Sequence, residues 1–336
     1  MKSHGFGVAL LSVIVIVASA SAHAQGTLTR TFVSSTGVDS NPCTIAQPCA
    51  SFAAAYRAVA ADGIVAALDP GKYGPLNILY PVTINGNGWA AITGTPNGAG
   101  ITVNTFSGHT NLIGIEIDGA NASFNGILFT SGSLTVTNCV IGKSDYVNDA
   151  TTGNGILIEP VDGIPALDIA ITNSTISNNG YMGIYYFPQG GNVNFNATID
   201  HVVVMNNAEH GIEIYSGNTS GGATVAAISD SIVSHNTNDG IVVGNGPGSL
   251  WLSIDHVEIN NNGQIGILAN NNSKVLLGRS VITGNGPSTG DFGSGIQNQT
   301  TNTFYSYGDN RINLNGNGAG GEEDINGALN TSFTTH

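Results

Sequence analysis

Residues 171–184 read ITNSTISNNGYMGI, and this pattern recurs along much of the chain. Clear copies stand at residues 199–212 (IDHVVVMNNAEHGI), 228–241 (ISDSIVSHNTNDGI) and 254–267 (IDHVEINNNGQIGI), and weaker ones begin at Val136 and Leu277. Aligned on the central apolar residue, successive copies are about 23 to 35 residues apart, a period that is typical of solenoids. We therefore expect one continuous solenoid rather than separate globular domains.

Two positions of the repeat are occupied by turn-forming residues. The first lies three residues before the central apolar residue and holds Asn138, Asn173, His201, Asp230, His256, Arg279 and Asp309. The second lies three residues after it and holds Asn179, Asn207, Asn236, Asn262 and Asn285. Each position forms a column in stacked coils, and Asn and Asp suit sharp bends because they tolerate left-handed backbone. We interpret both columns as structural; a catalytic or metal-binding role for the mixed His, Asp and Arg column is the alternative.

The composition agrees with short strands and tight turns. Gly accounts for 47 of the 336 residues, and charged residues make up 9% of the chain. Each copy of the repeat holds about three short apolar stretches separated by turn residues. In stacked coils, the inward apolar side chains of one coil pack on those of the next. The sequence therefore predicts an all-β fold, a right-handed parallel β-helix over residues 64–315.

The N-terminal segment has the pattern of a signal peptide. Lys2 supplies a positive start, residues 6–20 are apolar, and Ala22-His23-Ala24 matches an A-x-A cleavage site. We expect residues 1–24 to be removed near Ala24, and the mature protein to be periplasmic or secreted. No other apolar run is long enough to span a membrane, so the mature chain is expected to lack a transmembrane segment.

Residues 25–63 and 316–336 are expected to flank the solenoid. The first segment contains a short strand, a cysteine pair and the helix predicted over residues 51–61, with Ser51 as its N-cap and Asp62-Gly63 at its end. A solenoid has an exposed apolar end, so we assign this helix as the N-terminal cap. The polar segment 316–336 is expected to form a tail or a thin cap.

The chain has three cysteines with two different environments. Cys43 and Cys49 lie close together in NPCTIAQPC, and an exported chain meets an oxidising compartment, so we expect a disulfide between them. Cys139 falls at an apolar position of the repeat, where we expect a packed thiol rather than a nucleophile.

The net charge of −14 narrows the choice of partners. A strongly acidic protein is a poor ligand for nucleic acid or an anionic membrane. Neutral or cationic ligands, or a divalent metal, are compatible with this charge. The alternative is that the acidity only keeps the protein soluble.

Two stretches of the sequence resemble known proteins. The repeats ITNSTISNN, IDHVVVMNN and IDHVEINNN are similar to those of the pectin-lyase-like superfamily. Residues 32–59, FVSSTGVDSNPCTIAQPCASFAAAYRAV, resemble the N-terminal cap of exported bacterial right-handed β-helix repeat proteins. The resemblance covers about residues 30–315 and implies the fold. It does not imply one activity, because the superfamily includes polysaccharide lyases, hydrolases, epimerases, phage tailspikes and proteins without known activity.

The catalytic signatures of that superfamily are missing. The polygalacturonase-like set (Asn-Thr-Asp, Asp-Asp, Gly-His-Gly and Arg-Ile-Lys) is absent; the nearest fragments are His210-Gly211 and Arg311-Ile312-Asn313. The epimerase-like Asp-Pro-His-Asp is also absent, and pectate-lyase-like enzymes need an arginine base beside calcium-binding acids. No catalytic residue is therefore transferred by resemblance.

A ligand site should lie where the copies differ, on the Gly-Ile strands and in the loops around them. Strand alternation points each Ile inward and the next residue outward. The outward residues expected on three adjacent coils are Glu159, Tyr185, Phe187, Glu213 and Tyr215. Coils stack about 4.8 Å apart, which places Glu159 and Glu213 roughly 10 Å from each other. This is close to the carboxylate separation of inverting glycosidases.

We assign expected catalytic and substrate-binding roles to individual residues. Glu213 is the candidate acid or base, Glu159 its partner and His210 a proton carrier. Substrate binding is assigned to four residues: Tyr185, Tyr215, Phe187 and Lys143. No metal or cofactor is expected; calcium is weakly supported, because Asp145 and Asp149 lack the spacing of an Asp-x-Asp-x-Asp-Gly loop.

Two functions remain open at this stage. The first is a glycan-associated binding or surface scaffold protein without a recognisable catalytic set, with a polysaccharide as partner. The alternative is a polysaccharide lyase or glycoside hydrolase that acts through the Gly-Ile strands. The few basic residues and the missing signatures favour the first function.

Overall fold

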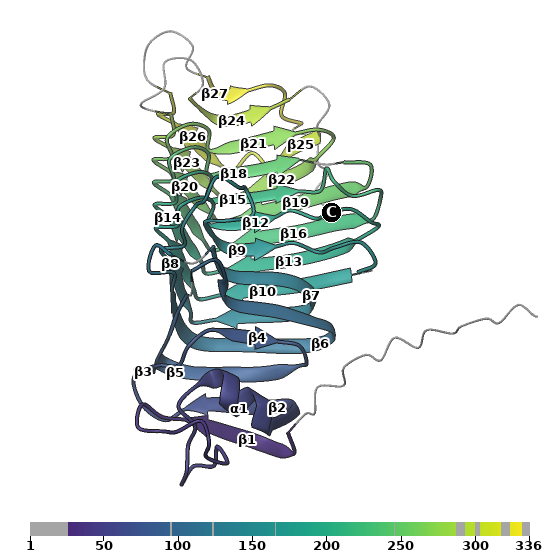
Figure 1. Cartoon of the computed structure of the whole chain (residues 1–336). Helices are drawn as coiled ribbons and strands as arrows, with labels where there is room; N and C mark the ends of the chain where they lie inside the picture. Colours follow the sequence, from purple (N-terminus) through teal and green to yellow (C-terminus); the bar gives the residue numbers. More distant parts are fainter. Residues whose placement is uncertain are drawn as a thin grey trace, which may run out of the picture.

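The computed structural model is a right-handed parallel β-helix, and Figure 1 shows its coils stacked from helix α1 at one end to strand β27 at the other. It describes residues 26–94, 96–122, 124–164, 166–244, 246–286, 293–299, 303–316 and 323–330. The expected signal peptide lies outside these residues. In the part of the chain that is described, no helix is long and apolar enough to cross a membrane.

Each coil contributes a strand to each of three parallel sheets. The Gly-Ile sheet contains β9 (Asn154–Ile158), β12 (Ile184–Tyr186), β15 (Ile212–Tyr215), β18 (Ile241–Gly244), β21 (Ile267–Asn270), β24 (Ser294–Asn298) and β27 (Glu323–Asn326). The broad sheet contains β10 (Ala166–Thr172), β13 (Asn194–Asp200), β16 (Ala223–Ser229), β19 (Ser249–Asp255), β22 (Lys274–Gly278) and β25 (Thr303–Ser306). The short sheet contains β8 (Val140–Gly142), β11 (Thr175–Ser177), β14 (Val203–Met205), β17 (Ile232–Ser234), β20 (Glu258–Asn260), β23 (Val281–Thr283) and β26 (Arg311–Asn313).

The N-terminal coils are built from longer strands. They are β1 (Leu28–Val33), β2 (Val59–Ala67), β3 (Gly71–Lys72), β4 (Leu76–Ile78), β5 (Val82–Thr93), β6 (Ala99–Asp118) and β7 (Asn125–Thr137). Strand β6 pairs with both β7 and β8, and β7 pairs with both β9 and β10, so one strand bends from sheet to sheet. At the other end, β27 adds a strand to the Gly-Ile sheet inside the segment expected as a tail or thin cap.

The core is the stack of inward side chains that the repeat predicts. Ile184, Ile212, Ile241 and Ile267 pair in register from coil to coil and are at most 2% exposed. Burying such a side chain stabilises the fold by about 1.5–3 kcal/mol relative to leaving it exposed. The fold class predicted from the sequence is confirmed.

Both polar columns lie at corners of the coils, and the Asn column has the structural role that was predicted. Asn138, Asn173, His201, Asp230, His256 and Arg279 all have φ between 46° and 56°, whereas Asp309, predicted in the same column, has no positive φ. The Asn column is buried, and each Nδ2 donates to the Oδ1 of the next Asn at 2.9 Å from Asn179 through Asn315. Asn315 then donates to Asp324 at 3.0 Å. An acid suits this position because its carboxylate accepts hydrogen bonds from both the backbone N–H and the Nδ2 of Asn315.

The Gly of each Gly-Ile pair is required by close approach of the coils. A Cβ on Gly183 would lie 2.5 Å from the carbonyl oxygen of Gly211, and a Cβ on Gly211 would lie 2.7 Å from that of Gly240. Neither residue has a positive φ. The repeated Gly therefore lets the backbones stack closely. The backbone N–H groups of Ile184 and Ile212 donate to the carbonyl oxygens of Gly211 and Gly240 in the next coil at 3.0 Å.

Helix α1 (Phe52–Ala58) caps the N-terminal end, but it is shorter than predicted. Ser51 Oγ accepts from Ala54 N at 3.2 Å, which confirms the N-cap. The predicted end at Asp62-Gly63 is wrong, because the chain from Val59 onward pairs with β1 and becomes strand β2.

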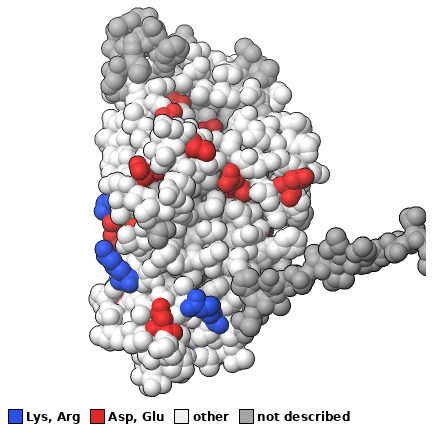
Figure 2. Space-filling view, in the orientation of Figure 1, with Lys and Arg blue, Asp and Glu red and all other residues white. Residues whose placement is uncertain are grey.

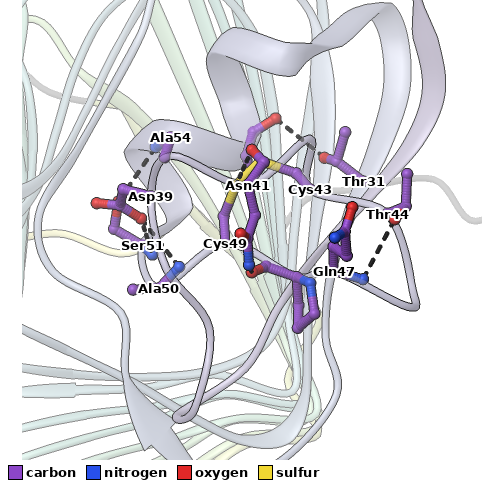
Figure 3. The surroundings of a disulfide bond; sticks show 12 residues. Thr31, Asp39, Asn41, Cys43, Thr44, Gln47, Cys49, Ala50, Ser51 and Ala54 are labelled. Atoms are coloured by element: carbon purple, nitrogen blue, oxygen red, sulfur yellow. Dashed lines mark hydrogen bonds between the residues drawn. A yellow bond between two sulfur atoms is a disulfide. The ribbon is translucent and has the colours of Figure 1, made fainter.

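The cysteine predictions are confirmed. Cys43 and Cys49 form a disulfide, and Cys139 is a free thiol that is 1% exposed. Burial raises the pKa of Cys139 to about 11. Figure 3 shows the disulfide beside the start of the helix, where Asp39 Oδ1 accepts from the backbone N–H groups of Ala50 and Ser51 at 2.9 and 2.8 Å.

Candidate functional site

A titratable cluster lies on the outer side of the Gly-Ile sheet. Strand register places Glu213 of β15 directly between Tyr185 of β12 and Val242 of β18. An aromatic and an aliphatic neighbour leave the carboxyl group little water. Burial raises the pKa of Glu213 to about 7, and the carboxylates of Glu209 and Asp239 add to the rise. Glu213 is therefore a carboxyl group that exchanges a proton near neutral pH.

His210 and Asp239 meet beside Glu213 from adjacent coils. Each directly precedes the Gly of a Gly-Ile strand, and their Nδ1 and Oδ2 atoms are 3.3 Å apart. The backbone N–H of Asp239 donates to His210 Nδ1 at 3.2 Å, so that nitrogen carries a lone pair and the imidazole is neutral. Burial lowers the pKa of His210 to about 4 and raises that of Asp239 to about 6. Because the imidazole is neutral, its contact with the Asp239 carboxyl group is not an ion pair.

Glu209 starts a row of polar side chains along the edge of this cluster. Asn238 Nδ2 donates to Glu209 Oε1 at 2.5 Å, and Gln264 Nε2 donates to Asn238 Oδ1 at 3.1 Å. The row crosses three coils at the same repeat position. Its amide and carboxylate groups could contact a ligand that lies parallel to the axis of the β-helix.

Aromatic side chains border the cluster on its N-terminal side. The rings of Tyr185 and Phe187 are 5.1 Å apart, and those of Phe187 and Tyr215 are 6.4 Å apart, at small interplanar angles. Tyr185, expected to present an exposed ring to a sugar, is 5% exposed, because Leu157, Met182 and their neighbours pack around it. Phe187 and Tyr215 are partly exposed and present the remaining aromatic surface.

The insertion before β9 covers this aromatic cluster. Ala150 packs against it, and Tyr146 stacks on Tyr181 with ring centroids 4.9 Å apart. The strand order predicts that Tyr185 points outward, but not that an insertion one coil away covers it.

Glu159 and Lys143 have partners outside the Glu213 cluster. Glu159 Oε1 accepts from Gln189 Nε2 at 2.9 Å, and burial raises the pKa of its carboxyl group, with a contribution from Asp149. Lys143 lies in a left-handed turn with φ of 60° and forms an ion pair with Asp118 at 3.0 Å. The carboxylates that raise the pKa of Glu213 belong to Glu209 and Asp239 rather than to Glu159.

The broad sheet carries surface features that the sequence reasoning missed. Trp251 is 48% exposed, and Lys274 Nζ lies 4.2 Å from the centroid of its ring. A cavity of about 140 Å³ adjoins Trp251, and a second of about 330 Å³ has a mainly apolar lining that also includes His109, Asp168 and Asn196. An outward Trp in a chain that is 7% aromatic is the signal that could have indicated this surface.

No family model and no curated protein matches the sequence. Among solved structures, pectate lyase Pel9A is similar with a TM-score of 0.54 and 16% identity, over 84% of this chain and 76% of the lyase. The A-module of Azotobacter vinelandii mannuronan C-5 epimerase AlgE6 follows with a TM-score of 0.45 and 13% identity, over 79% of this chain and 91% of the module. A rhamnogalacturonan lyase has a TM-score of 0.41 and 12% identity, over 82% of this chain and 73% of the lyase. The chain therefore shares the parallel β-helix fold of pectate lyase Pel9A.

Proposed function

We propose that this protein is an exported glycan-binding β-helix that holds a polysaccharide along the Gly-Ile sheet. The observation that carries the proposal is the outer side of the Gly-Ile sheet, where the polar row that begins at Glu209 precedes the strands and partly exposed Phe187 and Tyr215 stand at their ends. Aromatic faces offer apolar contact to sugar rings, and amides and carboxylates accept the hydroxyl protons. The fold that the chain shares with pectate lyase Pel9A adds support.

The charge of the protein favours a neutral or amino-sugar polymer over a polyuronate. The net charge is −14, and the face drawn in Figure 2 carries scattered acidic side chains with the few basic ones near its edge and N-terminal end. A polyuronate would meet Glu209, Glu213 and Asp239 with like charge. Like charges at short range oppose association by several kcal/mol.

A second function, lyase or hydrolase chemistry, is favoured by one specific observation. Glu213 has a pKa of about 7 and stands beside Asp239, whose pKa is about 6. Carboxyl groups whose pKa is raised towards neutral pH are suited to general acid–base catalysis. In this function Glu213 transfers the proton, His210 and Asp239 hold its environment, and Phe187 and Tyr215 hold the sugar. The roles of Glu159 as the partner carboxyl group and of Tyr185 and Lys143 in substrate binding stay predictions.

The test is a screen of the purified mature protein against neutral, amino-sugar and uronic-acid polysaccharides by affinity electrophoresis, with and without calcium. Tyr215→Ala is expected to weaken binding about tenfold, whereas Trp251→Ala on the broad sheet serves as the control and leaves it unchanged. Retention by no polymer, or equal loss in the two variants, would overturn the assignment to the Gly-Ile sheet.

Catalysis is tested on the same polymers by product analysis. If cleavage occurs, Glu213→Gln is expected to abolish it while binding is retained. Undiminished cleavage by this variant would exclude Glu213 as the proton-transfer group. Export is tested separately by the mass of the protein recovered outside the cytoplasm, which is expected to begin near Gln25.

A further inference from the structure

The corner that follows the broad sheet carries a second cluster of polar side chains, separate from the Gly-Ile sheet. Asp200 ends β13 and is followed by His201, and Asp230 stands at the same corner one coil further on. His256 occupies the corner of the next coil. The corner residues share a left-handed conformation, with φ of 53°, 46° and 56°, which fixes their backbone in one column.

The side-chain atoms at this corner that could coordinate a metal lie close together. One carboxylate oxygen each from Asp200 and Asp230 and one ring nitrogen of His201 all lie within 4.8 Å of one another. His201 Nδ1 is 2.7 Å from Asp200 Oδ2. Ser229 Oγ donates to the other oxygen, Asp200 Oδ1, at 2.6 Å, and so orients the carboxylate with Oδ2 towards the imidazole.

Asp230 is also held by a side chain of the next coil. His256 Nδ1 lies 2.5 Å from Asp230 Oδ1. A hydrogen-bonded partner behind a ligating carboxylate fixes its orientation and strengthens its binding to a metal. Among the described residues, Asp200, His201 and Asp230 form the group of three His, Cys, Asp or Glu side chains whose possible ligand atoms lie within 4.8 Å of one another.

We propose that Asp200, His201 and Asp230 bind one zinc ion, with His256 as the residue that positions Asp230. An imidazole with two carboxylates is a set of ligands that Zn²⁺ accepts, at metal–ligand distances of about 2.0–2.2 Å. All three residues are accessible from solvent. Water completes the coordination, because the corner faces outward.

The neighbouring coils explain why the site is confined to this stretch. The same corner position holds Asn138 and Asn173 on the N-terminal side, which offer no charge to a cation. On the C-terminal side, Arg279 pairs with Asp255 and places a fixed positive charge there. Zinc bound between Asp200 and Asp230 would link two adjacent coils, which gives the ion a structural role that does not depend on the proposed glycan binding.

The experiment is a titration of the metal-free mature protein with zinc chloride, followed by calorimetry and by thermal unfolding. His201→Asn and Asp230→Asn are suitable variants, because Asn adopts the left-handed conformation and already stands at this position in two coils. The matched control is His235→Asn, an exposed histidine with φ of 55° at a different corner.

We expect one zinc ion per chain and a higher unfolding temperature with zinc. Either site variant should weaken binding by about tenfold or more, His256→Asn by less, and the control not at all. The proposal is overturned if zinc produces no saturable binding, if the site variants bind as tightly as the wild type, or if His210→Asn is the variant that loses the ion. Each variant is checked in chelator, where its unfolding temperature should match that of the metal-free wild type.

Discussion

Replacement of Asn236 by alanine would test whether the buried Asn column holds the coils together. Asn236 Oδ1 accepts from the backbone N–H and the Nδ2 of Asn207 at 3.1 and 2.9 Å, and Asn236 Nδ2 donates to Asn262 Oδ1 at 2.9 Å. In Asn236→Ala the two donors of Asn207 lose their acceptor. Asn262 Oδ1 keeps the backbone N–H of residue 236, at 3.1 Å, as a donor.

The cost follows from the burial of these groups. Asn207 is 0% exposed, so its orphaned donors cannot reach bulk water. Each unsatisfied buried group costs about 1–3 kcal/mol, so the two donors give a loss of about 2–6 kcal/mol for the variant. The control is Asn206→Gly: this neighbour is exposed with φ of 56°, a conformation that glycine adopts freely, so the expected change is within about 0.5 kcal/mol.

The measurement is denaturant unfolding followed by circular dichroism, combined with hydrogen exchange of peptides from residues 204–236. Because coils of a solenoid contact only their neighbours, the loss should appear first as faster exchange in the coils beside residue 236. A loss below about 1 kcal/mol, or one equal to that of Asn206→Gly, would refute the reasoning that unsatisfied donors dominate.

Three further predictions concern close packing, pH and the disulfide. Gly183→Ala should destabilise the protein by about 2 kcal/mol or more, seen as a lower denaturant midpoint, because the new Cβ would lie 2.5 Å from both Gly211 O and Val204 Cγ1; an unchanged midpoint would mean that the coils separate freely. Glu213→Gln should stabilise the protein at pH 8 by up to about 3 kcal/mol. The raised folded-state pKa of about 7 means that the native state holds this proton more tightly than the unfolded state, so wild-type stability falls as pH rises from about 4.5 to 7. The difference between the two proteins should vanish below pH ~4.5, and a difference that does not vary with pH would contradict the assignment. Reduction of the Cys43–Cys49 disulfide should lower stability by about 2 kcal/mol, as expected for closure of a small loop, measured by thermal unfolding with and without reductant; an unchanged midpoint would show that α1 and Asp39 hold the cap without it.

The repeat made the scaffold predictable because each of its positions has one neighbour above and one below. Ile at one position must face Ile in the next coil, and Asn at another must face Asn, so a column could be identified from alignment alone. The period, the inward residues, the left-handed corners and the buried Asn column were all predicted in this way. The end of α1 was not, because pairing of Val59 with β1 overrides the helix preference of residues 59–61.

The candidate site depended on contacts that break the repeat. The sequence determined that Tyr185 and Glu213 stand on the outer side of adjacent strands, because side chains alternate along a strand. Only the tertiary structure decided that packing against Leu157 and Met182 buries Tyr185, and that Glu209 and Asp239 are the carboxylates beside Glu213. The periodic backbone fixes which way a side chain points, but burial and pKa depend on insertions and neighbours that follow no period.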